Sequence, residues 1–148
     1  MKGEVPIPLG RIMGHEPVGV IEKLGRGVSG FKEGQRVICG SCTPSGWTNA
    51  CLCGCSSMDG RDSRSGFQVA GGWRLGNTDE GTQAEYFVVP DAMANLAVIP
   101  DHLTDEQVLM CPDIMSTGFA GAEAGKVQIG DTVAIFAQGP IGLCSTAG

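Results

Sequence analysis

The stretch "GHEPVGVIEKLGRGV", residues 14–28, carries the sharpest pattern in this chain of 148 residues. It places a histidine next to a glutamate, His15 and Glu16. Four glycines frame and follow this pair: Gly14, Gly19, Gly25 and Gly27. Imidazole is a good zinc ligand, and a neighbouring carboxylate can bind the same ion or orient its ligands. Because "PVGVIEKL" alternates as a strand does, we expect a candidate metal ligand directly ahead of a β-strand.

Three further strands are predicted, over residues 35–39 ("QRVIC"), 82–89 ("TQAEYFVV") and 95–100 ("NLAVIP"). Residues 40–81 show no sustained period. A loop of that length inside a compact domain is usually functional. The first two thirds of the chain are therefore expected to be rich in β-structure and to contain one long functional loop.

The pattern changes after residue 100. Thr104, followed three residues later by Gln107, forms a capping box and predicts a helix start. "PDIMSTGFAGAEA", 112–124, predicts a second helix with proline in its first turn. The continuous apolar run "TVAIF", 132–136, is typical of a parallel strand covered on both faces. "AQGPIG", 137–142, then predicts a glycine turn and the opening of another helix.

Composition excludes several classes of protein. The chain is 42% hydrophobic and 18% charged, which indicates a folded domain. Its net charge of −6 makes nucleic acid or an anionic membrane an unsuitable partner. We find no secretory signal and no apolar run near the roughly 20 residues that span a bilayer. A cytoplasmic protein is expected.

The seven cysteines leave two alternatives open. An odd count without an export signal favours free thiols or metal ligands over disulfides. "CGSC", 39–42, and "CLCGC", 51–55, could together hold a structural zinc, or their thiols could be free. His102 is expected to be a solvated loop histidine. The cysteines are Cys39, Cys42, Cys51, Cys53, Cys55, Cys111 and Cys144.

The spacing in residues 14–28 resembles the signature of the zinc-dependent medium-chain alcohol dehydrogenases. "FKEGQRV" is similar to that family's Gly-Asp-Arg-Val turn, with Gln35 in place of the aspartate, and "CPDIMSTGFAGAE", 111–123, matches a further segment. The resemblance implies a mainly β fold with some α. Residues 1–130 would form most of a GroES-like catalytic β-barrel, incomplete at its N-terminus and followed by helices. Residues 131–148 would begin a Rossmann nucleotide-binding domain with its first β-turn.

The resemblance also implies roles for individual residues. Zinc would be held by His15, Glu16 and Asp113. An aspartate at the last position is typical of the branch that handles secondary alcohols and ketones. Trp73 and Ser41 would line the substrate pocket. The nicotinamide cofactor, NAD or NADP, would be contacted by Thr117, Gly139 and Gly142.

The implied activity is a reversible alcohol to ketone or aldehyde interconversion on small substrates. The family's upstream cysteine ligand and relay hydroxyl have no counterpart before His15, and the chain ends soon after the glycine turn. We therefore expect a truncated catalytic-domain fragment that is inactive alone. Its unpaired barrel edge and the 132–136 run predict self-association. The alternative is a non-catalytic zinc-binding or interaction module derived from such an enzyme.

Overall fold

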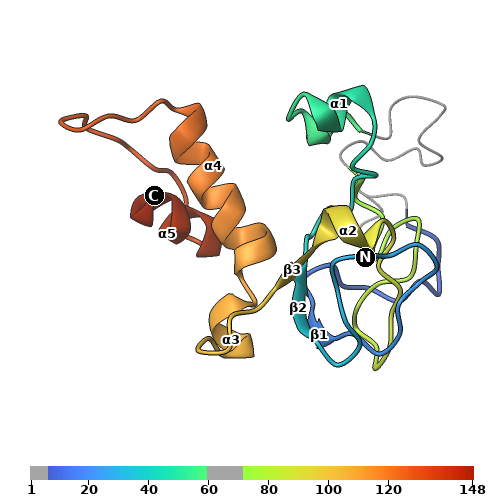
Figure 1. Ribbon diagram of the computed structural model, residues 1–148. Helices are drawn as coiled ribbons and strands as arrows, with labels where there is room; N and C mark the ends of the chain where they lie inside the picture. The colour runs from blue at the N-terminus through green and yellow to red at the C-terminus, as the bar shows by residue number, and fades with distance from the viewer. Residues whose placement is uncertain (1–6, 60–71) are drawn as a thin grey trace.

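The computed structural model describes residues 7–59 and 72–148 (Figure 1). Its sheet, within these residues, has three antiparallel strands in the order β1 (Val18–Val20), β2 (Arg36–Cys39) and β3 (Leu96–Val98). Val18 lies opposite Ile38. Val37 lies opposite Val98. The predictions of strands within 17–24, 35–39 and 95–100 are therefore confirmed at their centres.

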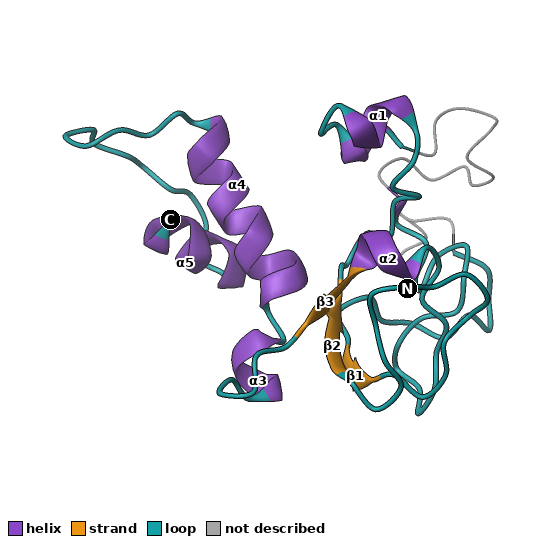
Figure 2. Ribbon diagram, in the orientation of Figure 1, coloured by secondary structure: helices purple, strands orange, loops and turns teal. Residues whose placement is uncertain are grey.

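The helices are short apart from two near the C-terminus (Figure 2). Figure 1 shows α3, α4 and α5 on one side of the sheet and long loops on the other. No helix among the described residues is long and apolar enough to cross a membrane. The helical elements are α1 (Asn49–Leu52), a 3₁₀-helix (Ser56–Met58), α2 (Ala92–Asn95), α3 (Asp105–Val108), a π-helix (Cys111–Met115), α4 (Ser116–Ala124) and α5 (Pro140–Ala147).

The predicted helix starts are confirmed. At the N-terminus of α3, the Gln107 amide donates to Thr104 Oγ1 and the Thr104 amide donates to Gln107 Oε1, which completes the capping box. The helix predicted over 112–124 exists, but its first turn is the π-helix rather than an α-helix. α5 begins directly after Gly139, as the glycine turn predicts. It packs on α4 so closely that a Cβ at Gly118 would lie 2.6 Å from Cys144 Cβ.

Two predicted strands, over 82–89 and 132–136, are wrong. The amides of Thr82 and Gln83 donate to Gly14 and Met13, but the rest of 82–89 forms no ladder. Residues 132–136 have no strand partner in the described part of the chain. An extended segment needs such a partner to count as a strand, because its backbone groups cannot bond within the segment. In the described sheet β1 and β3 are the two edges and do not pair with each other, so the sheet does not close into a barrel. A complete barrel therefore stays a prediction.

The apolar core is small and lies around the sheet. Val37 and Cys39 face it from β2, and Leu75 is fully buried. The other core residues are Ile21, Ile99 and Val108. Since the sheet is short, apolar burial alone does not explain what holds the described parts of the 40–81 loop in place.

Buried polar side chains hold the described parts of the 40–81 loop. Asp59, only 1% exposed, accepts hydrogen bonds from the Ser45 amide at 2.6 Å and from Thr48 Oγ1 at 2.7 Å. Asn95 Nδ2 donates to three backbone carbonyls, those of residues 44, 90 and 91. The Arg74 guanidinium donates to Thr43 Oγ1 and to an Asp91 carboxylate oxygen. These side-chain hydrogen bonds hold the loop segments together where no backbone ladder of a sheet does so.

Asp59→Asn is expected to destabilise the protein. Burial opposes the charged form, but the hydrogen bonds from Thr48 and Ser45 outweigh it and lower the pKa of Asp59. An asparagine would direct N–H groups at these donors, so the free energy of unfolding at pH 7 should fall by about 1–3 kcal/mol. Urea denaturation measures this change.

The pH dependence gives a second check on Asp59. A carboxyl whose folded pKa is lowered stabilises above its unfolded pKa, about 3.9, and the stabilisation is lost as pH falls through the folded value. The difference between the wild type and Asp59→Asn should therefore shrink as the pH is lowered below about 4. Asp101 is exposed, so Asp101→Asn is the matched control and should leave the free energy of unfolding unchanged. Equal stability of Asp59→Asn and wild type at pH 7 would refute this role.

Candidate metal centre

His15 follows a backbone junction that accepts only glycine. Gly14 has φ of +103°, and a Cβ there would lie 2.9 Å from Thr82 Oγ1. The Thr82 amide donates to the Gly14 carbonyl at 3.1 Å, and the Gln83 amide donates to Met13 at 2.9 Å. This close approach fixes the chain directly before His15, three residues ahead of β1.

Asp113 comes from the helical side of the molecule. It lies in the π-helix, where the Met115 amide donates to the Met110 carbonyl five residues back at 2.9 Å. Single π-turns inside helices occur frequently at functional sites. Ser41 Oγ donates to the Pro112 carbonyl at 3.2 Å and so ties the long loop to this turn.

The sheet side and the helical side meet at these residues. His15 Nε2 and Asp113 Oδ2 lie 3.0 Å apart although 98 positions separate them in the sequence. The two side chains are 34% and 28% exposed. One ligand atom each from His15, Glu16 and Asp113 lies within 4.8 Å of the others. This is the one such group of three or more candidate ligands in the part of the chain that the structure describes.

The donor set fits zinc. Zinc takes nitrogen and oxygen donors, and a catalytic site uses three protein ligands and keeps one position open. One imidazole and two carboxylates provide those donors, and the two negative charges match a divalent cation. Partial exposure of His15 and Asp113 leaves the group accessible from solvent.

Of the other predicted site residues, Trp73 and Thr117 lie next to a candidate ligand, and Gly139 and Gly142 do not. The Trp73 ring lies edge-on to His15, with centroids 6.0 Å apart and planes at 70°. Its buried Nε1 has no hydrogen-bond partner among the described residues. Thr117 Oγ1 donates to Asp113 Oδ1 at 3.2 Å. Gly139 caps α5 and Gly142 lies in its first turn, outside the group of three ligands.

A groove of about 1290 Å³ borders part of this centre. His15 and Glu16 line it at one end, and β1 and residues 82–89 form much of its walls. Trp73, Ser41 and Asp113 are not among its described lining residues. The groove therefore reaches His15 and Glu16 without including Asp113 or the two side chains predicted for the substrate pocket.

Of the two alternatives that the sequence left open for the cysteines, a structural zinc site or free thiols, the described residues support the second. Cys39 is buried in β2, and burial raises its pKa to about 12. The described cysteines contribute to no group of three candidate ligands, and all seven are free thiols. Cys42 was missed as a neighbour of the metal centre. Desolvation and the Asp113 charge raise the pKa of the exposed Cys42 thiol, against a hydrogen bond with Ser41 that lowers it.

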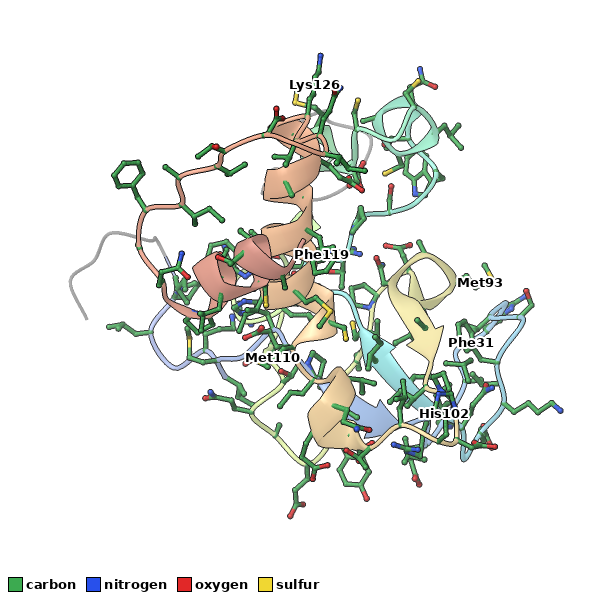
Figure 3. The ribbon with its side chains drawn as sticks, turned by 90° about the vertical axis from the view of Figure 1, so that its left-hand side faces the viewer. Phe31, Met93, His102, Met110, Phe119 and Lys126 are labelled. Carbon is green, nitrogen blue, oxygen red and sulfur yellow. The ribbon has the colours of Figure 1, made fainter. Side chains whose placement is uncertain are left out.

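One feature of the sequence could have placed Cys42 near the candidate site: it directly follows Ser41, which was predicted to line the substrate pocket. The second histidine lies elsewhere. His102 is exposed in the turn between β3 and α3, as expected (Figure 3).

Comparison with known proteins defines the class. Residues 1–101 match the model of the alcohol dehydrogenase GroES-like domain. The chain is 59% identical over its whole length to an alcohol dehydrogenase from Cupriavidus necator. Over 93% of its length it is 39% identical to an NADP-dependent isopropanol dehydrogenase from Thermoanaerobacter brockii. It spans 42% and 37% of these two relatives.

A solved structure agrees in fold. The apo zinc-dependent alcohol dehydrogenase 2 from Streptococcus pneumonia superposes with a TM-score of 0.77 at 34% identity, covering 97% of this chain and 38% of that one. The chain therefore belongs to the alcohol dehydrogenase GroES-like domain family, and the resemblance to zinc-dependent medium-chain alcohol dehydrogenases is confirmed.

Proposed function

We propose that this chain binds zinc through His15, Glu16 and Asp113 and forms the zinc-binding part of an alcohol dehydrogenase. The observation that carries the proposal is the convergence of three candidate ligand atoms within 4.8 Å. Bound there, zinc supplies a Lewis acid that polarises an alcohol or carbonyl oxygen. The proposed reaction interconverts small secondary alcohols and ketones. The isopropanol dehydrogenase activity of a 39% identical relative supports this substrate class.

The chain's own residues would bind and orient the reactants. His15 and Asp113 are each partly exposed, and their ligand atoms lie within 4.8 Å of each other and of one from Glu16. The Trp73 ring beside His15 would give an apolar wall that excludes water from one side of the substrate. Ser41 would act indirectly, because its hydroxyl holds the Pro112 carbonyl next to Asp113.

A nicotinamide cofactor, NAD or NADP, is proposed to carry the hydride. Thr117, Gly139 and Gly142 would contact it. In support, Ala137 has φ of +66° and Gly139 is the N-cap of α5, so the turn has a glycine-like backbone although its first position is alanine. Backbone amides at such a turn are suited to phosphate.

The domain arrangement is part of the same proposal. Residues 1–130 would belong to a GroES-like catalytic domain with a β-barrel, and residues 131–148 to the start of a Rossmann domain. The family match over residues 1–101 supports the first assignment. The apolar sequence of residues 132–136, followed by a glycine turn and α5, supports the second.

Self-association is also proposed. β1 is an edge of the described sheet, and Val20 in it is 60% exposed. An open strand edge pairs readily with another chain. Light scattering over a concentration series should report association, and Val20→Lys should reduce it while Val127→Lys, in a loop, should not. A monomer at every concentration would contradict this.

The metal and substrate assignments are tested together with Co²⁺, a coloured substitute for Zn²⁺. The apo chain should bind Co²⁺ at the site with visible absorption, and acetone should change the spectrum by occupying the open position. His15→Ala should abolish both signals, because it removes the one nitrogen donor. The matched control is His102→Ala, which changes the other histidine, exposed in a turn.

Each contrary result has a distinct meaning. Loss of Co²⁺ binding in His102→Ala, or its retention in His15→Ala, would contradict the ligand assignment. Co²⁺ binding at His15 without any response to acetone would contradict the catalytic role. It would favour a non-catalytic zinc-binding module.

A further inference from the structure

The two oxygens of the Asp113 carboxylate have different partners. Oδ2 lies 3.0 Å from His15 Nε2 and therefore faces the other candidate ligands. Oδ1 accepts a hydrogen bond from Thr117 Oγ1 at 3.2 Å. The carboxylate is thus held from the helix side at one oxygen and directed toward the metal centre with the other.

The sequence around Asp113 explains why Thr117 reaches it. Residues four apart on a helix lie on the same face, and Thr117 stands four positions after Asp113, in the first turn of α4. The adjacent Ser116 behaves differently. Its Oγ donates to the backbone carbonyls of Pro112 and Asp113, not to the carboxylate. Of these two neighbouring hydroxyls, Thr117 alone bonds the side chain of Asp113.

We propose that Thr117 is a positioning residue that makes Asp113 bind metal through Oδ2 alone. This inference rests on the proposed metal site. A carboxylate whose two oxygens are both free can chelate an ion with both. A chelating Asp113 would fill the coordination position that a catalytic zinc keeps open. A hydrogen bond at Oδ1 competes with that mode and orients the side chain.

This role differs from cofactor binding, the role that the family resemblance implies for Thr117. A residue that only contacts the nicotinamide has no effect on metal affinity when the cofactor is absent. A positioning residue changes the affinity and the coordination of the metal in the cofactor-free chain. Metal binding without NAD or NADP therefore separates the two roles.

The experiment compares Thr117→Val, Thr117→Ser and Ser116→Ala in the full chain. Thr117 is exposed, so valine removes the hydroxyl at nearly constant volume without opening a core cavity. Thr117→Val should weaken Co²⁺ and Zn²⁺ binding by about 10–100-fold, because the loss of a ligand-orienting hydrogen bond, which has effects on this scale, outweighs the second metal–oxygen bond of a chelating Asp113. Its Co²⁺ spectrum should also lose intensity, because a chelating carboxylate raises the coordination number above four.

The other two variants make the result specific. Thr117→Ser keeps the hydroxyl and should restore both affinity and spectrum. Ser116→Ala removes the neighbouring hydroxyl and should behave as wild type. Circular dichroism verifies that each variant is folded.

Three outcomes are decisive. The expected pattern across the variants supports the positioning role. Wild-type affinity and spectrum in Thr117→Val would overturn it and leave the proposed metal site intact. Failure of the wild-type chain to bind either ion would overturn the metal site, and the positioning role with it.

Discussion

No side chain fits at residue 14, and the position of His15 in the candidate metal centre depends on that constraint. A Cβ at Gly14 would meet the backbone nitrogen of Gln83 at 3.0 Å as well as the Thr82 hydroxyl. Because Gly14 has no side chain, the backbone of residues 12–14 can approach that of residues 81–83 and accept hydrogen bonds from its amides. His15 leaves this junction with a fixed starting direction. Its imidazole can then meet Asp113, which the π-helix presents from the other side of the molecule.

The surroundings of the site are held mostly by polar contacts. Three short strands enclose few apolar side chains, whereas Asp59, Asn95 and Arg74 connect loop segments through buried hydrogen bonds. Such networks are directional and fix loop geometry more narrowly than apolar packing does. They are also costly to break, because each lost partner leaves a buried group unsatisfied. A loop held this way can present Ser41 next to the π-helix without a strand beneath it.

Sequence patterns predicted the elements whose signals are local. The capping box at Thr104 and the alternation around Val18 depend on residues within one turn or one strand, and both elements exist. The strands predicted over 82–89 and 132–136 failed because a strand also requires a partner, which no local pattern supplies. The π-turn at Asp113 carried no recognisable signal beyond the nearby proline.

The candidate site required information of another kind. His15 and Asp113 are 98 positions apart, and periodicity cannot bring them together. Family resemblance paired them as candidate zinc ligands, and in the structure their side chains lie 3.0 Å apart. The same resemblance said nothing about Cys42, and the cysteine pattern left open whether it belongs to a zinc site or is a free thiol.

In the proposed site, nitrogen and oxygen donors rather than the abundant thiols would hold the metal. Zinc bound to imidazole and carboxylate has ligand distances of about 2.0–2.2 Å, whereas zinc–sulfur distances are about 2.3 Å. X-ray absorption spectroscopy of the chain loaded with one equivalent of Zn²⁺ measures these distances directly. We expect a shell of nitrogen and oxygen ligands without sulfur. A shell dominated by sulfur would move the metal to the cysteines and contradict the assignment of His15, Glu16 and Asp113.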